Sequence, residues 1–322
     1  MGEFDQTALK TTSLALGNNA RVIARGFEAV IVEDGDSIVK MFLNRANRCE
    51  RSLQNAEAEN RTLDLLEQYG FAPCEIPKKI EFIKFSSPVQ CGADSFVAAI
   101  RMTKLSGSQP DFQSLDEDFY RQCGRMIGKL HANAEAIPPS KLYEFENITT
   151  SFFAALEKHE IRSIPKNEID VLKELHLKFK TATAPIVLLH TDAAPNNILV
   201  NEQNEITGLV DWSNTAVGRR EDDFFHYGTN FINLPLAPDA RLSCVLDGYK
   251  TETGIELNKD AVKLSIMTTL ADYILHNEVA GEDMRAPFNK SLIASFKEMI
   301  SAYMPATLKD GPKIKIHRGM NK

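Results

Sequence analysis

From Leu188 to Asp211 the chain reads LLHTDAAPNNILVNEQNEITGLVD. Two short apolar runs in this stretch, residues 198–200 and 206–210, are separated by turn-forming polar residues, which predicts a hairpin of two strands. A second turn-rich polar segment precedes the first run, and an aspartate follows the second run. We therefore expect the polar side chains on both flanks of the hairpin to meet at the strand ends.

Four side chains in this stretch have the spacing of a phosphoryl-transfer site. His190, Asp192 and Asn197 form the pattern H-x-D-x-x-x-x-N, and Asp211 ends the stretch. Moving a γ-phosphoryl group needs Mg²⁺ beside the phosphate oxygens, oxygen ligands for that ion, and a carboxylate that orients and deprotonates the incoming hydroxyl. Asn197 and Asp211 suit the metal, and Asp192 suits the hydroxyl. A lone aspartate would be read as a turn residue, but the whole spaced set predicts chemistry.

The segment 190–212, followed by Gly218 and Asp223, resembles the aminoglycoside phosphotransferase family and its choline-kinase-like relatives. These enzymes share the protein-kinase-like fold, so the resemblance implies that fold here. One departure is Thr191, because these enzymes most often carry glycine after the histidine. Threonine in place of glycine could change the local backbone conformation, but it does not alter the side chains expected to carry the chemistry.

The resemblance also implies a role for each matching residue. Asp192 corresponds to the catalytic base, and Asn197 and Asp211 correspond to the Mg²⁺ ligands. His190 is a loop-shaping residue, and Asp223 resembles a buried aspartate that braces the catalytic loop. The implied acceptor is a hydroxyl-bearing small molecule such as an aminoglycoside, choline, or another amino alcohol or sugar.

The apolar runs near the N-terminus predict strands, and the third of them contains a lysine that suits phosphate binding. Lys40 lies in the run 37–42, after a D-G turn typical of hairpins. In kinases a helical glutamate holds such a lysine. The helix expected near residues 53–69 offers Glu57 and Glu59, and we favour Glu59 because it shares a helical face with apolar residues. A solvated strand lysine is the alternative.

The nucleotide is expected to contact two further segments. Gly26 stands where glycine-rich loops usually have several glycines, so it is weak evidence for a phosphate-covering loop. An apolar strand that ends in a polar connector is similar to the family's hinge between lobes. In that comparison Met102 lines the adenine pocket, and the backbone of Thr103 and Leu105 hydrogen-bonds the base. A plain strand-to-helix loop is the alternative.

The order of the patterns predicts an α+β, bilobal, protein-kinase-like fold, with a small strand-rich N-terminal lobe and a larger helical C-terminal lobe. Helical periodicity begins near Phe119 and returns in three stretches near residues 239–249, 259–279 and 289–303. We expect a nucleotide-binding lobe over residues 1–103, a catalytic and acceptor-binding lobe over 104–308, and a basic tail over 309–322.

Composition limits the class and the partners of this 322-residue chain. A hydrophobic content of 43% with 25% charged residues is ordinary for a globular protein, and a net charge of −7 disfavours nucleic-acid binding. No apolar run is long enough to span a membrane, and no secretion signal is visible. The five cysteines are scattered, which indicates neither disulfides nor zinc and favours the cytoplasm.

We therefore expect an ATP- and Mg²⁺-dependent phosphotransferase, with three alternatives. An atypical protein kinase uses the same groups, but only eleven residues separate Asp211 from Asp223, too few for a long peptide-docking segment. A nucleotide-binding module without catalysis would usually lack one member of the set. A metal phosphohydrolase would use as ligands His190, Asp192, Asp222, Asp223 and His226.

Overall fold

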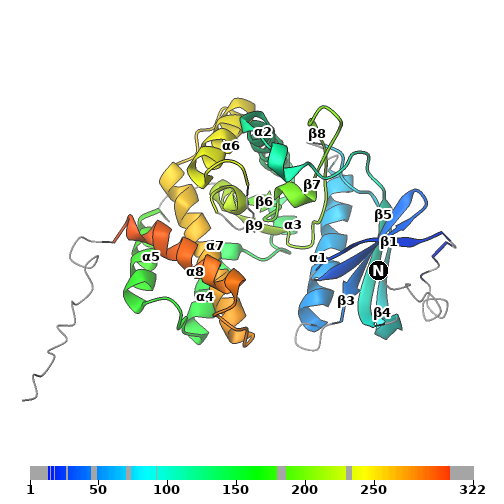
Figure 1. Ribbon diagram of the computed structural model, residues 1–322, viewed down its shortest axis with the longest axis horizontal. Helices are drawn as coiled ribbons and strands as arrows, with labels where there is room; N and C mark the ends of the chain where they lie inside the picture. Colours follow the sequence, from blue (N-terminus) through cyan, green and yellow to red (C-terminus); the bar gives the residue numbers. More distant parts are fainter. Residues whose placement is uncertain are drawn as a thin grey trace, which may run out of the picture.

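The computed structural model describes residues 14, 16–17, 19–26, 28–44, 49–69, 74–91, 93–179, 186–229 and 234–304. A strand-rich lobe comes first along the chain and a helix-rich lobe follows, and the two lie side by side (Figure 1). The predicted α+β, two-lobed architecture is therefore confirmed. The basic tail expected over residues 309–322 lies outside the described residues.

The N-terminal lobe is built on a five-stranded antiparallel sheet with helix α1 (Cys49–Gln68) against one face. Its tight β2–β3 turn places Gly35 at a φ of 63°, a conformation that glycine adopts without strain. The strand order is β1 (Arg21–Arg25), β2 (Ala29–Asp34), β3 (Ser37–Leu43), β5 (Asp94–Thr103) and β4 (Lys79–Cys91).

Strand β3 directs alternate side chains to opposite faces of the sheet, as the strand period requires. Val39 and Met41 are buried with residues of β2 on one face. Phe42 belongs to the core under α1 on the other face, and Ile38 packs against that core. The same alternation turns Lys40 toward α1, so an ammonium group is buried between strand and helix.

The C-terminal lobe is organised around α2 (Glu117–Ala134) and α6 (Pro238–Thr253), which lie side by side in Figure 1. Helix α2 begins at Asp116, whose side chain accepts a hydrogen bond from Phe119 N–H at 2.9 Å. Glycines allow the helices to approach closely. A Cβ added at Gly124 would lie 1.9 Å from the carbonyl oxygen of Val245.

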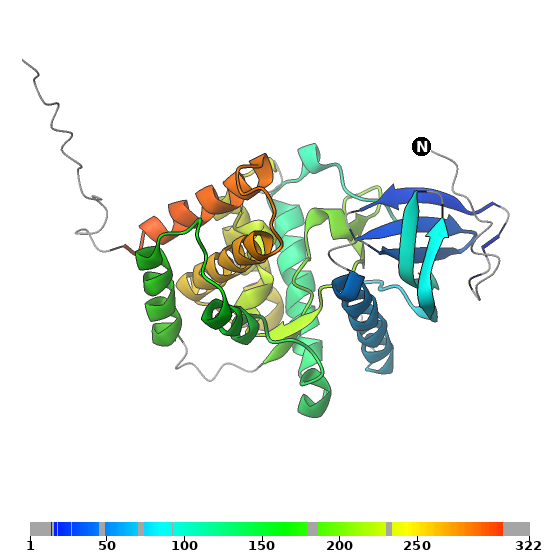
Figure 2. The ribbon, with the colours of Figure 1, turned by 90° about the horizontal axis from the view of Figure 1, so that it is seen from below.

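The remaining helices, apart from the short α3 near α1, cover the far side of this lobe, away from the N-terminal sheet (Figure 1 and Figure 2). Helix α7 is buried along most of its length and packs against the helices that surround it. These elements are α3 (Pro139–Leu142), α4 (Ile148–Lys158), α5 (Lys166–Phe179), α7 (Lys259–Val279) and α8 (Pro287–Ser301). No helix in the described part of the chain is long and apolar enough to cross a membrane.

Two small antiparallel ribbons carry the polar loops between the lobes. The expected hairpin is present, with β7 (Ile198–Val200) paired to β8 (Ile206–Leu209). The second ribbon joins β6 (Val187–Leu189) to β9 (Ala216–Gly218), so the chain enters and leaves the catalytic region through neighbouring strands. The predicted loop is therefore held at both ends.

The two lobes share backbone hydrogen bonds as well as a covalent connector. Thr207 O accepts a hydrogen bond from Glu75 N–H at 2.8 Å, and Glu75 O accepts one from Leu209 N–H at 3.1 Å. Glu75 precedes β4 in sequence but pairs with β8 in space. The division of the chain into lobes after Thr103, where β5 ends, remains a prediction. The pairing of Glu75 with β8 would join the two lobes across that division.

Candidate active site

Three charged side chains from distant parts of the chain meet between the lobes. The Nζ atom of Lys40 lies 2.7 Å from Oε2 of Glu59 and 2.7 Å from Oδ1 of Asp211. Strand β3 presents the lysine, α1 presents the glutamate, and Asp211 follows β8. Glu57, the other glutamate considered, forms an exposed ion pair with Lys84 at 2.9 Å. The structure thus brings Lys40 together with Glu59.

Burial and charge act in opposite directions on these three groups. Burial lowers the pKa of Lys40, but the carboxylates of Asp211 and Glu59 overcome this and raise it. Burial raises the pKa of Glu59, against the effect of Lys40. The pKa of Asp211 is lowered, because the Lys40 ammonium outweighs the effect of burial. Since the Asp211 side chain is 37% exposed and that of Glu59 only 1%, Asp211 is the carboxylate that a ligand can reach.

Asp211 has an unusual backbone conformation that fixes its carboxylate. Its φ is 65°, in the left-handed region that non-glycine residues seldom adopt. Ser213 Oγ donates a hydrogen bond to Asp211 Oδ1 at 2.6 Å, and Trp212 N–H donates one to Glu59 Oε1 at 3.3 Å. Oδ1 of Asp211 therefore binds both Lys40 and Ser213. These bonds, with the Trp212 N–H bond to Glu59, hold the residue in its strained backbone conformation.

His190 is buried and holds the loop to the hairpin. Its Nε2 lies 3.1 Å from Val210 O, and its Nδ1 lies 3.2 Å from Asp192 N. Since a carbonyl only accepts and an N–H only donates, these contacts assign the neutral tautomer protonated at Nε2. Burial lowers the pKa of His190, which favours this neutral form. The ring packs edge-on against Trp212, with centroids 4.5 Å apart.

Asp223 is a buried carboxylate that receives three hydrogen bonds. It accepts from His190 N–H at 3.1 Å and Thr191 N–H at 2.6 Å, and it lies 3.2 Å from His131 Nε2. Burial would raise the pKa of Asp223, but the hydrogen bond with His131 and the charges around it lower the pKa. The aspartate thereby ties the loop to α2, which carries His131.

Thr191 also has a positive φ, 66°, at the position where the related enzymes most often carry glycine. Its hydroxyl donates a hydrogen bond to Asn214 O at 2.8 Å. This bond and the Asp223 contact compensate for a backbone conformation that a β-branched residue rarely adopts. The loop therefore turns at Thr191 without glycine.

Asp192 and Asn197 lie next to each other in the same loop, with Asp192 partly exposed and Asn197 buried. Asn197 Nδ2 donates a hydrogen bond to Asp192 O at 2.8 Å, which fixes the carboxamide and the backbone of the aspartate together. The Asp192 side chain is 23% exposed. The arrangement leaves a carboxylate that can reach an acceptor hydroxyl beside a carboxamide that can reach a metal.

A single Mg²⁺ bridged to phosphates fits these residues. Mg²⁺ usually takes one or two protein carboxylates and completes its shell with water and substrate phosphates. Asp211 and Asn197 supply one carboxylate and one carboxamide oxygen. Within the described residues there is no group of three His, Cys, Asp or Glu side chains that could hold a metal alone. Asp211 and Asn197 could therefore hold Mg²⁺ only as part of a shell completed by water and phosphates.

The contacts of the candidate ligand side chains speak against the two-metal phosphohydrolase alternative. His190 and Asp223 use their polar atoms within the loop, as described above, and Asp222 accepts a hydrogen bond from Arg219 N–H at 2.8 Å. Only Asp192 and His226 of the proposed ligand set approach each other at the open side of the loop. The set does not converge on a metal site.

The predicted base-binding residues lie along the edge of the N-terminal lobe. Met102 is buried in β5 and Gly26 N–H donates to Ala29 O at 2.8 Å. Thr103 N–H donates to Lys78 O at 2.9 Å, so only the carbonyl of Thr103 is left for a base. Leu105 N–H has no hydrogen-bond partner among the described residues. Base recognition by this segment stays a prediction.

Three residues of the site make contacts that were not predicted. His131 is buried and connects Asp223 to Tyr249, whose hydroxyl lies 3.2 Å from Nδ1. Ser213 and His226 contact the two catalytic-type aspartates. The contacts of His131 and His226 depend on how distant segments pack, so no sequence spacing indicates them, whereas Ser213 contacts a residue only two positions away.

The fold and the site together define a kinase-like phosphotransferase. Solved structures with a similar fold include aminoglycoside 2'-phosphotransferase-IIIa in a GDP complex, with a TM-score of 0.65 and 14% identity over 92% of this chain and 97% of that chain. A choline/ethanolamine kinase family protein from Mesorhizobium loti has a TM-score of 0.60 and 12% identity, covering 94% of this chain and 95% of that one. A macrolide 2'-phosphotransferase from Brachybacterium faecium has a TM-score of 0.58 and 18% identity, covering 88% of this chain and 94% of that chain.

The chain belongs to the phosphotransferase enzyme family, whose model matches residues 19–243. It is therefore an enzyme, a phosphotransferase. A search among curated proteins found no match to the sequence.

Proposed function

We propose that the enzyme moves the γ-phosphoryl group of ATP to a hydroxyl of a small molecule, with Asp192 as the base. The observation that carries this proposal is the Lys40 ammonium, held 2.7 Å from Glu59 and 2.7 Å from Asp211. A buried ammonium beside a partly exposed carboxylate is suited to phosphate oxygens, and that carboxylate, Asp211, is suited to their metal ion.

The nucleotide would be held from both lobes. Lys40 contacts the phosphates while Glu59 keeps the ammonium in place, and the backbone near Gly26 covers them. Met102 lines the base, with the Thr103 carbonyl and the Leu105 N–H facing it. Mg²⁺, when bound by Asp211 and Asn197, neutralises negative charge on the phosphates.

The transfer step is assigned to the loop. The Asp192 carboxylate accepts the proton of the acceptor hydroxyl as its oxygen bonds to the γ-phosphorus and the bond to the leaving ADP breaks. His190 acts indirectly, because its neutral ring fixes the backbone of Asp192. Asp223 also acts indirectly, through the His190 and Thr191 amides.

The acceptor is proposed to be a small amino alcohol, amino sugar or aminoglycoside. The interval between Asp211 and Asp223 is filled by the short strand β9 and one turn of 3₁₀ helix, Arg220–Asp223, which leaves no long segment for a peptide. The similar structures were described with kanamycin, streptomycin or spectinomycin bound, and this supports the same chemical class here.

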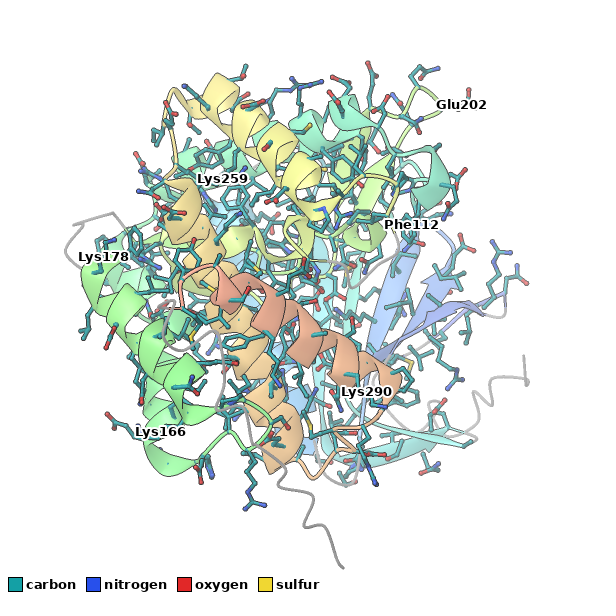
Figure 3. All side chains as sticks on the ribbon, turned by 60° about the vertical axis from the view of Figure 1, so that its left-hand side comes forward. Phe112, Lys166, Lys178, Glu202, Lys259 and Lys290 are labelled. Atoms are coloured by element: carbon teal, nitrogen blue, oxygen red, sulfur yellow. The ribbon has the colours of Figure 1, made fainter. Side chains whose placement is uncertain are left out.

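A nucleic-acid partner is not part of the proposal. Of the lysines labelled in Figure 3, Lys166 and Lys178 lie near the two ends of α5, Lys259 begins α7 and Lys290 lies in α8. The net charge of −7 also disfavours binding to a phosphate backbone. We also propose a reducing cytoplasmic location, because Cys74, Cys123 and Cys244 carry free thiols.

The proposal is tested by the release of ADP from ATP, or of GDP from GTP, in the presence of kanamycin, spectinomycin, choline or ethanolamine. We expect one of these acceptor classes to accelerate ADP release, with a product one phosphate heavier by mass spectrometry. Acceleration by a protein substrate and by none of the small molecules would reject the small-acceptor assignment.

A further inference from the structure

The imidazole of His226 faces the carboxylate of Asp192. Nε2 of His226 lies 2.7 Å from Oδ1 of Asp192, and the two side chains are 16% and 23% exposed. In the described part of the chain, Nε2 has no partner with hydrogen-bond angles, so the ring is close to Asp192 but not yet aligned with it. Hydrogen bonds in active sites without substrate are often poorly aligned and tighten when the substrate binds.

The chain holds these two side chains opposite each other through contacts on both sides. His226 lies in the short 3₁₀ helix Phe225–Tyr227, directly after the Asp223 brace. The next residue, Tyr227, donates a hydrogen bond from its hydroxyl to Ala193 O, the carbonyl that follows Asp192 in the loop. The Phe225 ring stacks on Tyr273 of α7, with centroids 5.5 Å apart. The His226 backbone is thus anchored to the loop and to α7.

Asp192 offers a reason for this contact. The backbone of Asp192 is hydrogen-bonded to His190 and Asn197, whereas the side chain within ion-pair distance of its carboxylate, among the described residues, is His226. A carboxylate that is only backbone-fixed can rotate about its side-chain bonds. A base must present one defined oxygen to the hydroxyl, because misplacement by about 1 Å can cost roughly 100-fold in rate.

We propose that His226 is a positioning residue for Asp192. Its Nε2–H donates to Oδ1, which leaves Oδ2 as the oxygen that accepts the acceptor proton. This inference rests on the proposed role of Asp192 as the base. His226 itself does not take part in proton transfer.

The test compares three variants, His226→Gln, His226→Asn and His226→Phe. Glutamine places its amide nitrogen near the position of a histidine Nε2, whereas asparagine reaches only as far as Nδ1. His226→Phe keeps the ring packing and removes the donor. His159→Gln, an exposed histidine after α4, is the matched control. Turnover is measured as ADP release with the four acceptors named above and with water alone, and ATP affinity by calorimetry.

For His226→Asn and His226→Phe we expect kcat to fall by about 10- to 100-fold, the range seen when a partner that orients a functional ligand is lost. His226→Gln and His159→Gln should stay within about threefold of wild type, with ATP affinity unchanged in all variants.

Two results would overturn the inference alone. Wild-type kcat in His226→Asn would show that the contact is dispensable, and a phenylalanine variant more active than the glutamine variant would assign His226 to packing. Full turnover in Asp192→Asn would instead reject the proposed base, and this inference with it. The two failures are therefore distinguishable.

Discussion

Lys40 Nζ contacts Asp211 Oδ1 at 2.7 Å across 171 residues of sequence, and the same nitrogen contacts Glu59. The lysine belongs to the sheet of one lobe, and Asp211 follows the hairpin of the other. One buried cation therefore joins β3, α1 and β8 around the position proposed for the nucleotide phosphates. Any change in the lobe arrangement must break or rebuild this cluster.

Replacing Lys40 by methionine should destabilise the protein and abolish nucleotide binding. The change leaves the Glu59 carboxylate buried beside Asp211 without a cation. Removing one partner of a buried pair typically costs about 3–5 kcal/mol. Urea unfolding followed by circular dichroism measures the loss. Lys84→Met, which breaks the exposed pair with Glu57, is the matched control and should cost at most about 1 kcal/mol. Equal losses in the two variants would contradict the account.

Asp223→Asn should destabilise the protein in a pH-dependent way. The folded-state pKa of Asp223 is lowered, so its stabilisation is present above the unfolded pKa of about 3.9 and is lost as pH falls through the folded value. Hydrogen bonds to a charged group contribute about 1.5–3 kcal/mol. The difference in unfolding free energy between wild type and variant should be constant from pH 5 to 7 and shrink below about pH 4. A difference that grows toward acid pH would contradict the assignment.

Thr191→Gly should change stability by less than about 1 kcal/mol, since the left-handed backbone costs a non-glycine residue about 1–2 kcal/mol and the hydroxyl bond to Asn214 recovers about 1 kcal/mol. Thr191→Val keeps the strain and loses that bond, so it should be the less stable variant by thermal unfolding. If valine were tolerated better than glycine, the hydroxyl would have no part in the turn.

Gly124→Ala should separate α2 from α6. The added Cβ would lie 1.9 Å from Val245 O, a backbone atom that cannot rotate away. Overpacking typically costs about 1–3 kcal/mol, and backbone displacement adds to it. Gly254→Ala, at the end of α6 where no atom lies within 4 Å, tests the cost of a positive φ alone. We expect the larger loss of melting temperature at Gly124.

The sequence predicts the helices and strands that have a clear cap or a clear apolar period within their own residues. Helix α2 has a capping aspartate and an acidic first turn, and α7 was expected over residues 259–279, the bounds that the structure shows. Strand β4 was not predicted. It is an edge strand with Pro88 and few buried residues, so its apolar pattern is weak. Helices α4 and α5 were not assigned either.

The site residues likewise fall into those that the local sequence predicts and those that depend on packing. Spacing within one segment pointed to Asp192, Asn197 and Asp211, and the pairing of Lys40 with Glu59 followed from the order of strand and helix. The contacts of His226 and His131 join residues 34 and 92 positions from their partners. Such contacts arise from packing of the folded chain, and a single sequence has no periodicity that encodes them.

The central claim is that Lys40, Asn197 and Asp211 bind an ATP–Mg²⁺ complex that Asp192 turns over. Calorimetric titration with ATP, with and without Mg²⁺, tests it on the wild type, Asp211→Asn and Asp192→Asn. We predict Mg²⁺-dependent binding with a Kd of about 1 mM or tighter, in the usual range for enzyme substrates. Asp192→Asn should bind equally well and release no ADP, and Asp211→Asn should lose the Mg²⁺ dependence. Absence of Mg²⁺-dependent nucleotide binding by the wild type would contradict the account.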